Sequence, residues 1–184
     1  MPISKAPLCR FGCAYVEWIH DELVNALWRG TDPVAQNEYR DLNLLDSALG
    51  RPFQSACGQD AYPGVIQKSA ALFHSLVSNH PFHNGNKRTA VIAVDAFLLA
   101  NGYALALSNE AVYKLAQDTA SYRSRGTTHE QAFHQIETQL REHSVSLDVF
   151  YREQRKDKSL AELYAAGIRL RRFVRRRPEN SILI

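Results

Sequence analysis

The chain has few cysteines and no long uninterrupted hydrophobic run. Its 184 residues include only Cys9, Cys13 and Cys57, a low and odd number that argues against a disulfide framework and fits a reducing compartment. No stretch of about 18 consecutive apolar residues occurs, so we expect no membrane span. The first residues are not followed by the apolar segment of a signal peptide. These absences favour a protein of the cytoplasm over a secreted or membrane protein.

The alternating pattern of half-buried β-strands is also nearly absent. Apolar residues instead recur at steps of three and four, which indicates amphipathic helices and an all-α fold class. Between the helices, residues 51–63 are expected to form an exposed loop with room for a small hairpin, and residues 103–107 a short extended piece. The helices are expected over about residues 14–29, 42–49, 65–79, 87–100, 109–122 and 130–143.

Positive charge is concentrated towards the C-terminal end. Of the 22 basic and 19 acidic side chains, ten basic and five acidic ones lie from Ser144 onwards. This shift divides the chain into a nearly neutral body, residues 1–143, and a basic extension, residues 144–184, whose pattern is helical up to about residue 177. We expect the extension to present a solvated helix face or to contact a protein partner. Contact with nucleic acid through its arginines is the less favoured alternative.

One stretch, HPFHNGNKRTA at residues 80–90, places a polar loop directly before a helix. The first amides of a helix lack partners inside it and lie at the positive end of its dipole, so such a terminus binds phosphate. Gly85 lets the backbone approach an anion closely and permits a positive φ. Lys87 and Arg88 stand in the first turn, where two cations oppose the dipole unless an anion is bound there. The stretch therefore predicts a phosphate site.

His80 stands at the other rim of this loop. Histidine is the usual general base near neutral pH because its ordinary pKa is about 6.5. Transfer of a phosphate-containing group requires positioned reactants, neutralised charge and an oriented nucleophile, with little covalent help from the protein. A base beside a phosphate site predicts this kind of reaction, with a hydroxyl group as the nucleophile.

The segment HPFHNGNKR resembles the signature of the Fic/Doc superfamily, H-P-F-x-[D/E]-G-N-[G/K]-R, at seven specified positions. The upstream segment YRDLNLLDSALGRP, residues 39–52, is similar to the corresponding segment of Doc-like toxins, and the similarity covers about residues 14–125. So many matches disfavour the alternative that residues 80–90 are an ordinary helix connection. The resemblance implies a compact helical bundle in which the motif loop joins two central helices.

The resemblance also implies roles for individual residues. It implies that His80 is the base that activates a target hydroxyl, with Lys87 and Arg88 as further catalytic residues, and that residues 51–63 form a flap that docks the target segment. Lysine at position 87 is typical of the Doc type, which transfers the terminal phosphate of ATP to elongation factor Tu, whereas AMP-transferring Fic enzymes usually have glycine there. The implied binding residues for the phosphates of ATP or another nucleotide are Asn84, Gly85, Asn86, Lys87 and Arg88.

The sequence departs from the family at Asn84, where the signature has an acidic residue that is often a metal ligand. An amide oxygen can bind Mg²⁺ without contributing charge, so a weak Mg²⁺ site is expected there. The inhibitory pattern [S/T]-x-x-x-E-[G/N] is not found, so the resemblance implies a separate antitoxin polypeptide. The leading hypothesis is a Doc-like toxin that phosphorylates a target such as elongation factor Tu and blocks translation. The alternatives are an AMP or other nucleotidyl transferase and a degenerate nucleotide- or partner-binding regulator.

Other histidines have simpler interpretations. His74 lies among apolar residues of an expected helix and is interpreted as a packed or surface side chain. His83 occupies the variable position of the motif and is expected to be exposed. Cys9, Cys13 and His20 do not have the spacing of a zinc site.

Overall fold

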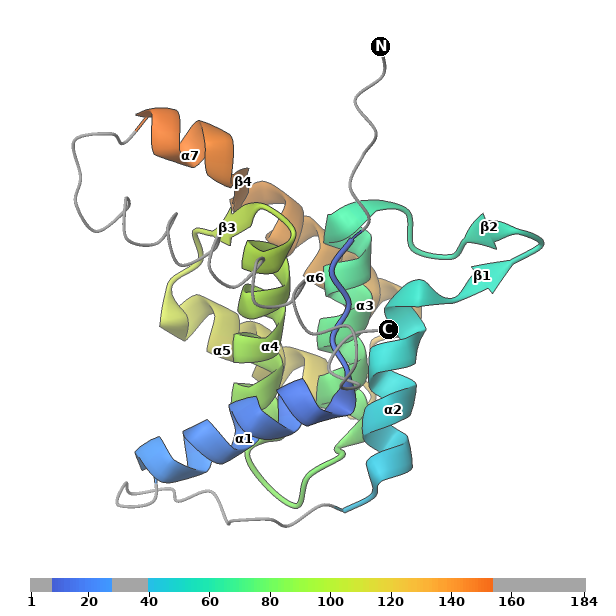
Figure 1. Cartoon of the computed structure of the whole chain (residues 1–184). Helices are drawn as coiled ribbons and strands as arrows, with labels where there is room; N and C mark the ends of the chain where they lie inside the picture. Colours follow the sequence, from blue (N-terminus) through green and yellow to red (C-terminus); the bar gives the residue numbers. More distant parts are fainter. Residues whose placement is uncertain (1–7, 28–39, 154–184) are drawn as a thin grey trace.

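Two helices, α3 (Gly64–Asn79) and α4 (Asn86–Ala100), form the centre of the molecule. The computed structural model describes residues 8–27 and 40–153, and Figure 1 shows most of the other helices of this part packed around the central pair. The expected all-α class is confirmed, with only two short sheets in the described residues. The surrounding helices are α1 (Cys13–Leu27), α2 (Leu42–Gly50), α5 (Asn109–Ala120) and α6 (His129–His143), whereas α7 (Leu147–Glu153) lies beside the second sheet.

Capping residues fix the starts of three helices where the sequence predicts them. Asp41 precedes α2, and its carboxylate accepts a hydrogen bond from the amide of Asn43 at 2.8 Å. Ser108 caps α5 in the same manner, and Thr128 caps α6 in a reciprocal capping box with Gln131. Local hydrogen bonds of this kind depend only on neighbouring residues, which explains why these boundaries could be predicted.

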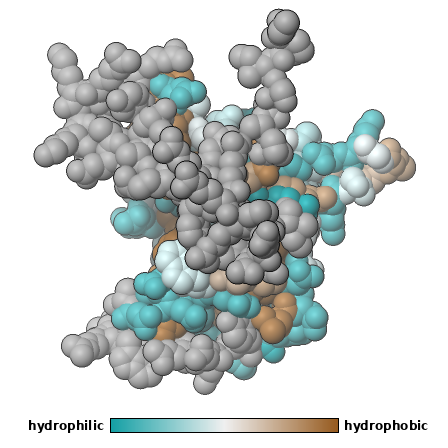
Figure 2. All heavy atoms as spheres, in the orientation of Figure 1, coloured by the Kyte–Doolittle hydropathy of each residue, from teal (hydrophilic) through white to brown (hydrophobic). Residues whose placement is uncertain are grey.

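The core surrounds α3. Every residue from Lys68 to Val77 is buried, so the middle of this helix is covered on all sides, as expected for a helix at the centre of a bundle. Exposed large hydrophobic side chains of the described part are few, and the face shown in Figure 2 has small hydrophobic areas among hydrophilic residues. No helix in residues 8–27 and 40–153 has the length and hydrophobicity needed to cross a membrane. The largest fully buried side chains include Phe73, Leu76, Phe97, Leu98, Leu45, Ile136 and Leu140.

The second sheet shows that the sequence pattern after residue 143 is not helical from its start. β3 (Tyr103–Leu105) pairs antiparallel with β4 (Ser144–Ser146), so the helix predicted over residues 144–177 is wrong at its first three residues. The backbone groups along the edge of β3 form hydrogen bonds with the extended residues of β4, which a helix could not make. Next to this pairing, the amide of Leu147 donates to the carbonyl of Gly102 at 2.8 Å. Helix α7 then follows, and the remainder of the predicted helix lies outside the described residues. The division of the chain at residue 143 stays a prediction.

The first sheet is a hairpin anchored at the start of α3. The short helix η1 (Arg51–Phe53) leads into β1 (Ser55–Ala56) and β2 (Gln59–Asp60), which confirms the small hairpin expected in this loop. The buried ammonium group of Lys68 donates to the carbonyl of Pro52 at 3.0 Å and to the carboxylate of Asp60 at 3.1 Å. The hairpin is thus held against the N-terminal half of α3.

This anchoring places the hairpin away from the motif loop. The hairpin precedes the first residue of α3, and His80 follows its last residue, so the 16-residue helix separates them by about 24 Å. Figure 1 shows the hairpin and the loop between α3 and α4 at opposite ends of α3. The hairpin therefore does not lie beside the motif loop, and the docking of a target segment by residues 51–63 stays a prediction.

His74 is a packed histidine in the middle of α3, as interpreted from the sequence. It is 2% exposed, and its ring centroid lies 4.5 Å from that of His129 and 5.6 Å from that of Tyr122. Burial, followed by the charges of His129, Arg51 and Arg123, lowers the pKa of His74 to about 4. The folded protein therefore opposes protonation of this ring.

We predict that His74 makes the fold sensitive to acid. Between the ordinary pKa of 6.5 and the folded pKa of about 4, the unfolded chain binds a proton here that the folded chain does not. The free energy of unfolding should therefore fall by about 3 kcal/mol from this residue between pH 7 and pH 4. In His74→Phe, the side chain at this position cannot be protonated. The free energy of unfolding of this variant should therefore fall by about 3 kcal/mol less than that of the wild type over the same pH range, as measured by urea denaturation at each pH. Ile136→Val, a buried change without a titratable group, should keep the wild-type pH dependence. An unchanged pH dependence in His74→Phe would contradict this account.

Candidate functional site

The motif loop is closed by a side chain of α4 that folds back onto it. The amide oxygen of Asn86 accepts a hydrogen bond from the backbone amide of Phe82 at 2.9 Å, and its nitrogen donates to the carbonyl of Phe82 at 2.7 Å. Both residues are buried. Gly85 stands before α4 with φ at 74°, which confirms the positive φ expected there. These contacts give the loop between the two central helices a fixed shape.

His80 ends α3 in a left-handed conformation with φ at 50°, which is uncommon for a residue other than glycine. The following Pro81 disfavours the right-handed helical conformation at His80, so the helix ends here, as the sequence predicts. The carbonyl of Pro81 accepts hydrogen bonds from the amides of Arg40 at 2.9 Å and Asp41 at 3.3 Å. The chain that enters α2 therefore holds the loop from one side.

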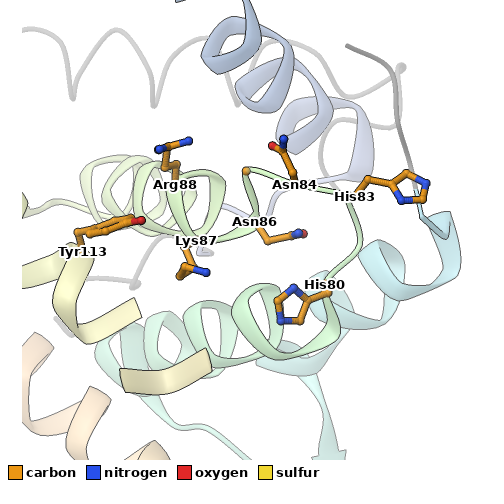
Figure 3. Close-up of a pocket in the computed structure, with 8 residues that line it drawn as sticks. His80, His83, Asn84, Asn86, Lys87, Arg88 and Tyr113 are labelled. Atoms are coloured by element: carbon orange, nitrogen blue, oxygen red, sulfur yellow. The ribbon is translucent and has the colours of Figure 1, made fainter. Parts of the chain in front are cut away.

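A pocket of about 270 Å³ opens at this loop. In Figure 3, the side chains of His80 and Lys87 face the same space, and the ring of His83 points away from it. Tyr113 reaches the pocket from α5, opposite the loop. The structure thus brings together all the predicted site residues, whose roles remain predictions. The complete lining is His80, His83, Asn84, Gly85, Asn86, Lys87, Arg88 and Tyr113.

The charge around His80 suits a general base. Burial, followed by the positive charges of Lys87 and Arg40, lowers the pKa of His80 below its ordinary value of 6.5. The imidazole is therefore neutral at neutral pH and has a lone pair that can accept a proton. These cations also disfavour a protonated ring unless an anion is bound nearby, so proton transfer and anion binding at this site support each other.

The start of α4 has the properties of an anion site. Its first amides lie at the positive end of the helix dipole and have no acceptors within the helix. Lys87 and Arg88 add two cations in this turn, both on the wall of the pocket. The side chain of Asn86 is held by Phe82, so the phosphate binding predicted for Asn86 would come from its backbone amide. The arrangement can hold a group with several negative oxygens beside a neutral base.

The residues expected at a metal site are sparse. Asn84 is exposed at the pocket and offers one neutral amide oxygen. The described residues contain no group of three or more His, Cys, Asp or Glu side chains that could hold a metal ion. Mg²⁺ often takes only one or two protein ligands and completes its shell with phosphate oxygens and waters. The donor set therefore fits a metal that arrives with a nucleotide and not one held by the protein alone.

Two site residues were missed in the sequence. Arg40 precedes the capping residue of α2, and only its place in the upstream segment YRDLNLL indicated any importance. Tyr113 lies in α5, beyond the motif, where it is half-buried and no local pattern distinguishes it. Both reach the site through the packing of helices that are far from the loop in sequence. His83 is exposed, as expected.

Comparisons with known proteins agree with this geometry. Residues 11–98 match the model of the Fic/DOC family. A protein named Toxin Doc from Mycolicibacterium smegmatis is 51% identical over 67 residues, which cover 36% of this chain. The match spans 52% of that relative, or about half of its length. No solved structure matches significantly. The family match contains the loop between α3 and α4 with its HPFHNGNKR sequence, so this part of the chain is similar to the Fic/DOC family.

Proposed function

We propose that this chain is a Doc-like toxin that transfers a phosphate group from ATP to a hydroxyl group of a target protein. The supporting observation is that one pocket combines His80, whose pKa is lowered, with Lys87, Arg88 and the positive end of α4. The relative named Toxin Doc supports the toxin part of the proposal. Lysine at position 87 favours the Doc type over AMP-transferring members of the family.

The reaction divides between the two sides of the pocket. The target hydroxyl gives its proton to the neutral imidazole of His80, and its oxygen attacks the terminal phosphorus of ATP. The bond between that phosphorus and the bridging oxygen breaks, and ADP leaves with the electron pair. Lys87, Arg88 and the first amides of α4 stabilise the negative charge on the phosphate oxygens, which is the main contribution that a protein makes to phosphoryl transfer.

Mg²⁺ is part of the proposal as a weakly held ion. When bound, it would neutralise charge on the phosphates. Asn84 would hold it through the amide oxygen, and the nucleotide would supply further ligands. A pocket of about 270 Å³ is smaller than the roughly 300–1,000 Å³ of sites that enclose a whole drug-sized ligand. We therefore assign the pocket to the phosphate end of the nucleotide.

The proposed partners follow from the same assignment. The target would be a translation factor such as elongation factor Tu, whose modification blocks translation in the cytoplasm. An antitoxin polypeptide would control the activity, since the chain lacks the inhibitory pattern of self-regulated members. A protein partner is also proposed for the basic extension, most of which lies outside the described residues.

Replacing His80 tests the enzyme. We expect His80→Ala to slow transfer by about 10²- to 10⁴-fold, the usual effect of a general base, while ATP still binds. Expression of His80→Ala in bacteria should no longer arrest growth. His134→Ala is the matched control, since this exposed histidine of α6 does not line the pocket, and it should keep activity. A regulator without catalysis would instead keep its effect on growth in His80→Ala.

The dependence on pH tests the state of the base. Since the neutral form of His80 accepts the proton, kcat/KM should rise with pH to a midpoint below 6.5 and then stay level through neutral pH. Lys87→Met removes one of the positive charges that lower the pKa of His80, so the acidic limb should move to higher pH. Rates measured from about pH 5 to about pH 8 would show both effects. An acidic limb that does not move in Lys87→Met would contradict the assigned base.

Labelled ATP identifies the transferred group. Incubation with elongation factor Tu or a bacterial lysate should transfer label from the γ position and none from the α position. Phosphoryl transfer leaves the α phosphorus on ADP, whereas nucleotidyl transfer carries it to the target. Transfer of only the α label would replace the kinase proposal with the nucleotidyl alternative. Protein that modifies nothing and does not arrest growth would instead support a degenerate regulator.

A further inference from the structure

A buried histidine outside the motif contacts the motif loop from α1. His20 is 2% exposed, and its ring stacks on that of Phe82, with centroids 3.9 Å apart and planes 4° from parallel. Its Nδ1 atom lies 3.1 Å from the hydroxyl oxygen of Thr89, near the start of α4. One side chain therefore contacts both ends of the segment 82–89, which contains the predicted phosphate-binding residues. Figure 1 shows α1 passing beside this loop.

The first contact leads directly to the anion site. Phe82 is buried, and its backbone amide and carbonyl are both bonded to the side chain of Asn86. The stack therefore fixes the ring of Phe82, the backbone of Phe82 fixes Asn86, and Asn86 precedes Lys87 in the first turn of α4. Protein interiors are close-packed, so removal of the imidazole would leave a space into which Phe82 and the loop can move.

The second contact fixes the other end of the segment. Thr89 is 1% exposed, and its hydroxyl group is paired with Nδ1 of His20. Burial lowers the pKa of His20, so the ring is neutral and this hydrogen bond is satisfied with one proton between the two atoms. Loss of one partner would leave a buried polar group unsatisfied, which is costly in a site closed to water. Other buried residues of α1, such as Val16 and Ile19, serve the core without touching the loop through a polar group.

We propose that His20 is a positioning residue that holds the motif loop, and through it His80 and the phosphate-binding turn, in the geometry needed for transfer. The catalytic consequence rests on the proposed function, but the position of the loop can be measured without it. Productive geometry tolerates displacements of only about 0.5 Å, so a residue that locks both ends of the loop affects a reaction that it does not touch. Helix α1 thereby becomes part of the support of the site.

Three substitutions separate the two contacts. His20→Phe keeps a ring over Phe82 and removes Nδ1, Thr89→Val removes the hydroxyl partner, and His20→Ala removes both contacts. Ile136→Val controls for lost packing, because Ile136 is buried in α6 away from the loop. The measurements are the pKa of His80 by NMR, the affinity for ATP by calorimetry and the melting temperature. They are made on the full chain.

We expect His20→Ala to raise the pKa of His80 towards 6.5, because a loosened loop exposes the ring and moves it away from Lys87. The affinity for ATP should fall by about tenfold, or about 1.4 kcal/mol. His20→Phe and Thr89→Val should give smaller changes in the same direction. The double variant should change the pKa of His80 and the affinity for ATP no more than either single variant does, because both substitutions remove the same hydrogen bond. Ile136→Val should change only the melting temperature.

Two results would overturn the proposal. One is an unchanged pKa of His80 and unchanged ATP affinity in His20→Ala while its melting temperature falls, which would make His20 a packing residue only. The other is full additivity of His20→Phe and Thr89→Val. If His20→Ala does not fold, the same measurements on His20→Phe and Thr89→Val decide whether His20 positions the loop. If the wild type neither binds ATP nor transfers phosphate, the proposed function fails, and the pKa of His80 still decides whether His20 positions the loop.

Discussion

The paired hydrogen bonds between the side chain of Asn86 and the backbone of Phe82 determine the geometry of the whole site. They close the loop between α3 and α4 in the interior, where both groups would otherwise be buried without partners. A buried polar group left unsatisfied costs about 1–3 kcal/mol, so loop shapes that break these bonds are disfavoured. With the loop closed, Gly85 turns the chain into α4, and His80 and the first turn of α4 face one pocket.

Several unfavourable features accumulate around this loop, and a bound anion would relieve the electrostatic ones. Lys87 and Arg88 oppose the dipole of α4, and His80 has a left-handed backbone that costs about 1–3 kcal/mol at a residue other than glycine. The pKa of His80 is lowered by its burial and by two neighbouring cations. Such departures from local preference are expected at functional sites, where the rest of the fold offsets them. Here the offset comes from the core around α3 and from the contacts that fasten the loop.

The features that could be predicted from the sequence are the helix starts and the motif loop, which depend on residues close together in the chain. Asp41, Ser108 and Thr128 cap helices through bonds to residues two or three positions away, and the motif fixes the loop by local turns. Strand β4 was missed because it exists only through pairing with β3, about 40 residues earlier in the chain. Tyr113 was missed as a pocket residue for the same reason, since its position depends on how α5 packs against α4. His20 was seen only as a poor zinc ligand, because its stacking on Phe82 is a tertiary contact.

Residues 51–63 do not form an edge of the site. The β1–β2 hairpin is fastened by Lys68 at the far end of α3, so it does not border the pocket. The chain that does reach the loop from the α2 side is the stretch at Arg40 and Asp41, whose amides bond to the carbonyl of Pro81. Arg40 also contributes to the lowered pKa of His80, so its charge acts on the base itself. Arg40, before α2, and Tyr113, of α5, therefore influence the site from outside the motif: Arg40 acts through its charge, and Tyr113 forms part of the pocket wall.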